Sequence, residues 1–228
     1  MNKSLSTWRF LLKQLQQNIP VMMLYVLDSK GSSPGRQGFF MGVTQNGEME
    51  GSVGGGIMEH KFVELAKEKL KSSSNEISIR KQIHDKAAAN NQSGMICSGE
   101  QTILLYALKI EDLNTIDSIV STLLQNKNGS LRISPTGLHF ENELPQKDFY
   151  YQYDSENDWL YEEKIGYKNH LFIVGGGHCA LAFSELLLQA DISECNPVHC
   201  ENAIPHASDS HERVSDNHPI SLHISSLD

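Results

Sequence analysis

Apolar residues along the chain recur with two different spacings, which predict a mixture of helices and strands. Trp8, Leu11, Leu12 and Leu15 follow one another at helical spacing, so a helix is expected over 5–17. Pro20 ends this helix, and the apolar run that follows it predicts a buried strand over 21–27.

The same reasoning predicts further elements as far as residue 159. A strand at 39–44 is followed by a hairpin turn at 45–48, a helix at 57–70, strands at 76–84 and 101–108, a helix at 114–125 and short strands over 131–159. A loop over 85–100, which contains Cys97, separates two of these strands. The expected fold class is α/β, with a mixed α/β module at the N-terminus.

A second module is expected to begin at His170. An apolar strand at 171–174 leads into the sequence GGGHCA, which fits G-x-G-x-x-A, and an apolar helix follows at 181–188. Glycines in such a turn let the backbone approach a pyrophosphate, so Gly175 and Gly177 are candidate binding residues. A tight turn without a nucleotide is the alternative, because no second strand ending in a ribose-binding acid follows.

The composition changes at residue 189. Residues 189–228 contain no glycine, aromatic residue or lysine, and seven acidic residues stand there against one arginine. Such a segment buries little apolar surface, so we expect poor order. A metal-binding or regulatory segment, built from its five histidines with Cys195 and Cys200, is the alternative, but spacings of four or more residues in an unpatterned stretch favour random composition. The predicted division of the chain is 1–165, 166–188 and 189–228.

The overall composition excludes some classes of protein. A net charge of -9 among 228 residues argues against a nucleic-acid partner. No apolar stretch approaches the ~18 to 20 residues of a membrane span, and no signal peptide is apparent, so a cytoplasmic protein is expected. The four cysteines show no C-x-x-C spacing, which argues against a disulfide framework or a structural zinc site.

Two glycine-rich loops follow predicted strands in the first module. Both could present free N–H groups to an anion or a polar ring, and the first adds hydroxyls and a guanidinium. The candidate binding residues are Gly31, Ser32, Ser33 and Arg36 in the first loop, and Gly51, Ser52, Gly54, Gly55 and Gly56 in the second. The alternative for each loop is a tight turn with no ligand.

A third loop, 94–100, places the thiol of Cys97 between Gly94 and Gly99. Flexible flanking residues give access to the thiol, and N–H dipoles stabilise the thiolate, which binds soft metals or carries sulfur. A buried cysteine that acts only as a small apolar residue is the alternative.

In this order the loops resemble those of the XdhC/CoxI family, whose members are maturation factors for molybdenum hydroxylases of the xanthine dehydrogenase and carbon monoxide dehydrogenase type. Residues 31–36 resemble the family's G-S-S-P-x-x loop, 51–59 its G-S-x-G-G-G-x-x-E turn, and 95–99 its M-x-C-G-G loop. Residues 170–188 are similar to the start of the family's C-terminal Rossmann domain.

The sequence departs from this family at three places. Ser98 stands where the family usually has glycine, and Ile57 stands where it often has cysteine. The remainder of the Rossmann domain is missing after residue 188, which a truncated or frameshifted coding sequence would explain.

The resemblance implies an accessory protein that binds molybdenum cofactor and delivers it, in sulfurated form, to an apo molybdenum hydroxylase. The two glycine loops would hold the anionic pterin, and Cys97 would act on the molybdenum or its sulfur. Glu59 and Glu100 flank the loops and would hydrogen-bond pterin nitrogens, with a solvated carboxylate as the alternative for each. Gly99 is a further candidate binding residue. A cysteine desulfurase is a further candidate partner.

The alternative function is a small NAD(P)-dependent oxidoreductase that uses the GGGHCA turn. It requires an intact second βαβ half, which residues 189–228 do not provide, so no NAD(P) binding is expected. An exposed apolar helix at 181–188 would also favour association between copies of the chain.

Overall fold

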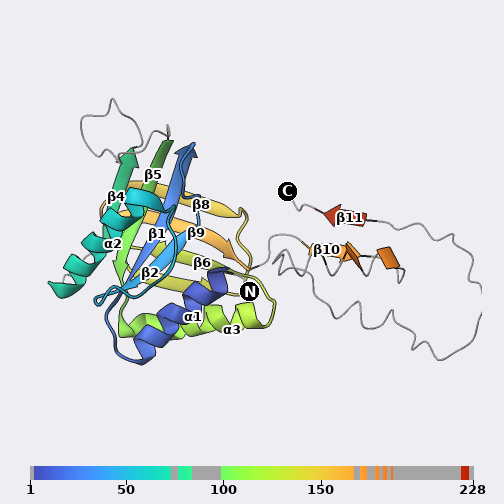
Figure 1. The fold of residues 1–228 in the computed structure, drawn as a ribbon, viewed down its shortest axis with the longest axis horizontal. Helices are drawn as coiled ribbons and strands as arrows, with labels where there is room; N and C mark the ends of the chain where they lie inside the picture. The colour runs from blue at the N-terminus through green and yellow to red at the C-terminus, as the bar shows by residue number, and fades with distance from the viewer. Residues whose placement is uncertain are drawn as a thin grey trace, which may run out of the picture. The chain divides into compact units, whose positions relative to one another are not determined.

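The computed structural model describes residues 3–72, 77–83, 99–166, 170–173, 178–179, 182–183, 186 and 222–225. One compact unit spans Lys3–Gly166 and holds helices α1 to α3 and strands β1 to β9 (Figure 1). Strands β10 and β11 belong to a second unit. Helices and sheets are mixed throughout the larger unit, which confirms the predicted α/β class.

A five-stranded antiparallel sheet forms the centre of the larger unit. Its strands lie in the order β3-β2-β1-β5-β4, and each neighbouring pair is antiparallel. They are β1 (Val21–Gly31), β2 (Phe40–Thr44), β3 (Met49–Gly51), β4 (Ser78–Ile83) and β5 (Gly99–Ala107). The apolar run that predicted a buried strand is the central strand β1.

Strand β1 is buried on both faces, which explains why its apolar residues are continuous rather than alternating. Met22 and Leu24 pack with helix α2 (Gly56–Lys71) in one apolar cluster. Met23 and Tyr25 point to the other face and join a second cluster, since successive side chains of a strand alternate between faces.

The second cluster is covered by two helices and a second sheet. The helices are α1 (Lys3–Gln16) and α3 (Leu113–Leu124), the latter preceded by a 3-10 turn over Ile110–Asp112. The sheet is antiparallel in the order β7-β6-β9-β8. Its strands are β6 (Gly129–Ser134), β7 (Gly137–Glu141), β8 (Phe149–Ser155) and β9 (Asp158–Ile165). Leu131 and Tyr161 contribute its buried face.

The boundaries of two strands correct the predicted ones. Strand β1 continues to Gly31, four residues beyond the apolar run, and β5 begins at Gly99 rather than at Gln101. The reason is that Gly31 and Gly99 are directly paired across β1 and β5. Gly99 and Glu100, which were expected in a loop, are therefore strand residues.

The second unit contains the start of the predicted second module. Strand β10 (His170–Ile173) pairs antiparallel with β11 (Leu222–Ser225), and residues 178–179, 182–183 and 186 are helical. Composition predicts no strand at 222–225, so β11 is a difference from the expectation. Its direction also differs from that of the parallel neighbour that a dinucleotide-binding βαβ unit has. The three-part division of the chain stays a prediction.

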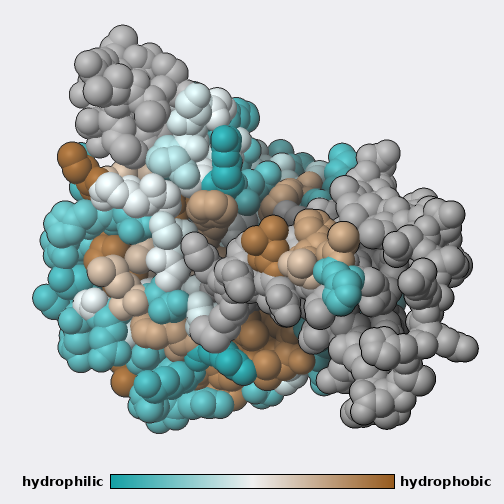
Figure 2. Space-filling model, turned by 45° about the vertical axis from the view of Figure 1, so that its right-hand side comes forward, coloured by the Kyte–Doolittle hydropathy of each residue, from teal (hydrophilic) through white to brown (hydrophobic). Residues whose placement is uncertain are grey.

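On the face drawn in Figure 2, hydrophilic residues cover much of the described surface, and hydrophobic residues lie between them. No helix within the described ranges has both the length and the apolar character needed to cross a membrane.

Candidate functional site

The first glycine loop, 31–36, begins where β1 ends. Ser32 and Arg36 are exposed, whereas Ser33 is buried and its hydroxyl donates to the carbonyl of Gly35 at 3.3 Å. The guanidinium of Arg36 donates to the carbonyl of Gly31, also at 3.3 Å. Ser33 therefore shapes the loop, while Ser32 and Arg36 present polar groups to the solvent.

The second glycine loop connects β3 to the start of α2. Gly51, Gly54, Gly55 and Gly56 all have positive φ, with values of 95°, 128°, 75° and 71°. Residues with a side chain rarely adopt this conformation, which gives a backbone reason for the cluster of glycines.

The carboxylate of Glu59, in the first turn of α2, binds this loop. One of its oxygens, Oε2, accepts hydrogen bonds from the N–H groups of Val53 at 2.9 Å and Gly55 at 3.0 Å, and from the hydroxyl of Ser52 at 2.6 Å. A negative charge at a helix N-terminus is stabilised by the helix dipole. Glu59 thus takes, for these two N–H groups, the place that was expected for an external anion.

The two glycine loops contact each other through their backbones. A Cβ atom on Gly54 would lie 2.6 Å from the nitrogen of Gly35, and one on Gly35 would lie 2.1 Å from the carbonyl oxygen of Val53. Neither position has room for a side chain. The structure therefore brings together two loops that lie some twenty residues apart in the sequence.

The start of β5 lies beneath both loops. Gly99 packs against the first loop, where a Cβ atom would lie 2.7 Å from the nitrogen of Ser33. Two residues later, the buried side chain of Gln101 donates to the carbonyl of Gly35 at 2.9 Å and to that of Val53 at 3.2 Å. Sequence analysis missed Gln101, although a polar residue at the head of an apolar strand was the available signal.

Glu100 lies at the same edge of the sheet, next to positively charged side chains. Its carboxylate pairs with Lys81 of β4 at 2.7 Å. This hydrogen bond lowers the pKa of the Glu100 carboxyl, and Lys30 adds a weaker attraction. Basic groups therefore accompany the loops even though the chain as a whole is acidic.

The segment that contains the two glycine loops is similar to a known protein family. Residues 14–80 match the XdhC and CoxI family. This finding confirms the resemblance drawn from the motifs. The matched segment contains both glycine loops and Glu59, and it ends before β5.

A solved structure supports the fold. The crystal structure of a xanthine dehydrogenase from Bacillus halodurans is similar with a TM-score of 0.50 and 15% sequence identity. The similarity covers 72% of this chain and 54% of that chain, so the present chain spans about half the length of that protein. No curated protein matches the chain.

Three residues expected at an XdhC/CoxI site lie outside the described residues. They are Cys97, Gly175 and Gly177. Their roles as thiol ligand and as nucleotide-binding glycines stay predictions. Within the described ranges there is no group of three or more His, Cys, Asp or Glu residues that could hold a metal ion.

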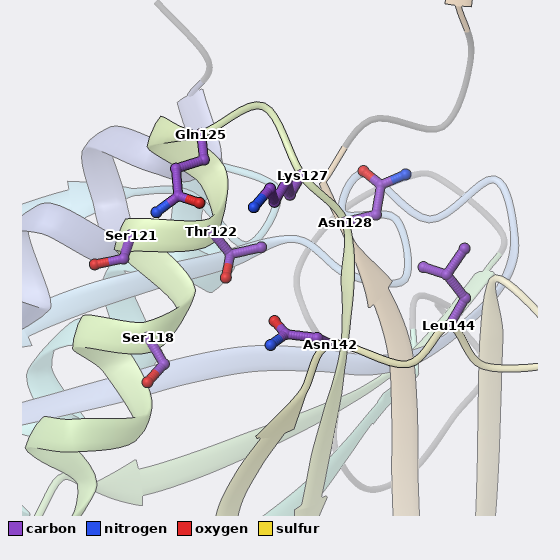
Figure 3. A pocket seen from close by; sticks show the side chains of 8 residues that line it. All are labelled: Ser118, Ser121, Thr122, Gln125, Lys127, Asn128, Asn142 and Leu144. Atoms are coloured by element: carbon purple, nitrogen blue, oxygen red, sulfur yellow. The ribbon is translucent and has the colours of Figure 1, made fainter.

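A cavity of about 610 Å³ lies elsewhere in the larger unit (Figure 3). It is lined by Ser118, Ser121, Thr122, Gln125, Lys127, Asn128, Asn142 and Leu144, from helix α3 and the segments around β6 and β7. None of the described candidate residues lines it. The lining of this cavity therefore includes no residue of the two glycine loops.

Proposed function

We propose that this chain binds molybdenum cofactor at the joined glycine loops and delivers it to an apo molybdenum hydroxylase of the xanthine dehydrogenase type. The observation that carries the proposal is the contact of the family's motif segments 31–36 and 51–59 with each other and with Gly99. The family match over residues 14–80 supports the same function.

The exposed groups of the site fit the chemistry of this cargo. The cofactor is an anionic pterin that carries a phosphate, so it requires N–H donors and positive charge. Ser32 and the Arg36 guanidinium are exposed, and the first turn of α2 adds N–H groups at Gly56 and Ile57 that the helix cannot satisfy itself. Arginine suits phosphate because its planar fork donates two parallel hydrogen bonds.

Glu59 restricts where the anionic part of the cargo would bind. Its carboxylate already holds the N–H groups of Val53 and Gly55 and carries a negative charge of its own. The phosphate would therefore lie toward Arg36 and the first turn of α2. Glu100, which pairs with Lys81, would act as an acceptor for pterin N–H groups.

Cys97 supplies the soft ligand in this proposal. It precedes Gly99 by two positions in the sequence, and Gly99 is packed against the first loop. A thiolate is a suitable ligand for a soft metal, so Cys97 would contact the molybdenum or its sulfur. Cys97→Ala removes that ligand and little else.

The receiving partner would be an apo-hydroxylase, with a cysteine desulfurase as the source of sulfur. An oxidoreductase that uses the GGGHCA turn is the second candidate considered. The described part of the second unit does not support an oxidoreductase, because β10 pairs with an antiparallel strand, whereas a dinucleotide-binding βαβ unit has parallel strands.

Reconstitution of an apo-hydroxylase tests the proposal. Purified apo-enzyme is mixed with molybdenum cofactor, with and without the full chain, and the recovered hydroxylase activity is measured. We expect the chain to increase recovery and the Cys97→Ala variant to increase it less. Equal recovery with and without the chain would contradict the proposed delivery.

A further inference from the structure

The side chain of Gln101 is the described group that hydrogen-bonds both glycine loops at once. Its carboxamide nitrogen has two N–H donors, and they go to the carbonyls of Gly35 and Val53 at 2.9 and 3.2 Å. The residue is 0% exposed, so water does not compete for these donors. Hydrogen bonds in such surroundings are costly to remove, because the carbonyls lose their partner without gaining solvent.

The backbone around Gln101 is packed too closely for another arrangement. A Cβ atom on Gly35 would lie 2.3 Å from the Gln101 nitrogen. The backbone nitrogen of Gly35 also lies close to Gly54, where a Cβ atom would be 2.6 Å from it. Gly35, Val53 and Gln101 therefore form one close-packed joint, which we call the Gln101 joint.

The chemistry of the joint accepts few substitutes. Glutamate has the same length but offers acceptor oxygens to two carbonyl acceptors when ionised. Methionine fills a similar volume but has no donor. Asparagine has the donors but is shorter by one methylene group.

We infer that Gln101 is a positioning residue that holds the two glycine loops in one fixed relation and thereby sets the affinity of the site for its cargo. The identity of the cargo in this inference rests on the proposed function. The positioning role of Gln101 rests on the geometry of the Gln101 joint. Loops that are already ordered before binding raise the affinity for the cargo, because binding then loses less conformational entropy.

Hydrogen exchange of the full chain tests the joint without any cargo. In Gln101→Met, we expect amide exchange about tenfold faster in both segments, 31–36 and 51–56, the factor that corresponds to loss of a typical buried hydrogen bond. The control is Thr102→Val on the same strand, whose side chain points to the other face of the sheet. Exchange in this control should match the parent in both segments.

A second variant tests the same joint independently, in case Gln101→Met does not fold. Gly35→Ala disrupts the same joint from the opposite side, and its backbone does not require a positive φ. Faster exchange in both segments, with the rest of the larger unit unchanged in both variants, supports the inference. Unchanged exchange in either segment of Gln101→Met would overturn it.

Titration with molybdenum cofactor released from a purified hydroxylase then tests the link to the cargo. We expect Gln101→Met to bind about tenfold more weakly than Thr102→Val, and saturating cofactor to restore slow exchange in both segments. A structural defect elsewhere would not be reversed by the cofactor. If the parent chain itself binds no cofactor, the proposed function fails, and the exchange data alone decide whether the joint exists.

Discussion

The carboxylate of Glu59 accepts a hydrogen bond from the backbone N–H of Gly55 at 3.0 Å, so the helix that follows the glycine turn binds that turn through its own first-turn side chain. The same oxygen also accepts from Ser52 and Val53. Glu59 thus holds the N–H groups of Val53 and Gly55 and the hydroxyl of Ser52 together.

Glu59→Ala should destabilise the larger unit by about 1 to 2 kcal/mol, because the donors at a helix N-terminus lose their acceptor. The matched control is Glu64→Ala on the same helix, whose exposed carboxylate pairs with Lys67 at 2.8 Å. Surface pairs of this kind contribute little. Equal urea midpoints for the two variants would show that Glu59 does not hold the loop.

Tyr25 and Tyr161 share one buried acceptor, Glu163 of β9, and the Tyr25 bond joins the two sheets. Each hydroxyl donates to Glu163 Oε2 at 2.6 Å, and Tyr25 lies on β1 while Tyr161 lies on β9. Burial, followed by the Glu163 charge, raises the pKa of both tyrosines, so they stay protonated donors. Tyr161→Phe should therefore cost about 1 to 3 kcal/mol of unfolding free energy.

The control for that measurement is Tyr150→Phe on β8. Its hydroxyl bonds Gln152 in an exposed position, so the loss should stay within about 0.5 kcal/mol. The two variants are compared by urea unfolding at neutral pH. A cost for Tyr161→Phe no larger than that for Tyr150→Phe would mean that the buried hydrogen bond to Glu163 does not stabilise the fold.

Asp112 gives the fold a pH dependence of definite sign. Burial raises the pKa of its carboxyl above the ordinary value of 3.8, although the carboxyl accepts from the Lys109 N–H and from Tyr106. Because the folded state then binds more protons than the unfolded state, this group's contribution to stability is present below pH 3.8 and is lost as the pH rises through the raised pKa.

Asp112→Asn removes that titration. The unfolding free energy of the variant, minus that of the parent, should rise as the pH increases from about 4 toward neutral. Urea unfolding at a series of pH values measures this difference. A difference that does not change with pH would show that Asp112 has an ordinary pKa in the folded chain.

Sequence patterns predicted most elements of the larger unit because its apolar residues have clear periods. The continuous run at 21–27 predicted a strand, and the structure shows why it is continuous: β1 is covered on both faces. The order of the strands in the sheet could not be predicted in this way, because neighbouring strands such as β1 and β5 lie more than sixty residues apart in the sequence. Local spacing contains no information on that pairing.

The two glycine loops were singled out from the sequence, but their contact through Gln101 was not predicted. The loops Gly31–Arg36 and Gly51–Gly56 were predicted because glycine residues cost conformational entropy, so a group of them indicates a tight turn or a binding loop. Gln101 was missed because a glutamine at a strand start normally faces solvent. The interior position of Glu163 breaks the apolar pattern of β9, and the hydroxyls of Tyr25 and Tyr161 donate hydrogen bonds that offset the burial of its carboxylate.

Arg36 tests which group would bind the anionic part of the cargo. Arg36→Met keeps most of the side chain's apolar stem but removes the guanidinium, so cofactor affinity should fall about tenfold, as expected for one charge-assisted hydrogen bond. Arg9→Met, an exposed arginine of α1, serves as the control. If both variants bind cofactor as tightly as the parent, the phosphate does not lie at Arg36.

Mass spectrometry of the full chain, purified from cells that make molybdenum cofactor, shows whether the joined glycine loops hold that cofactor. We expect pterin to co-purify in stoichiometric amounts with the parent and with Arg9→Met, and in reduced amounts with Arg36→Met and Gln101→Met. A parent chain that carries no pterin, in cells shown to contain the cofactor, would contradict the proposal that the joined glycine loops are a molybdenum cofactor site.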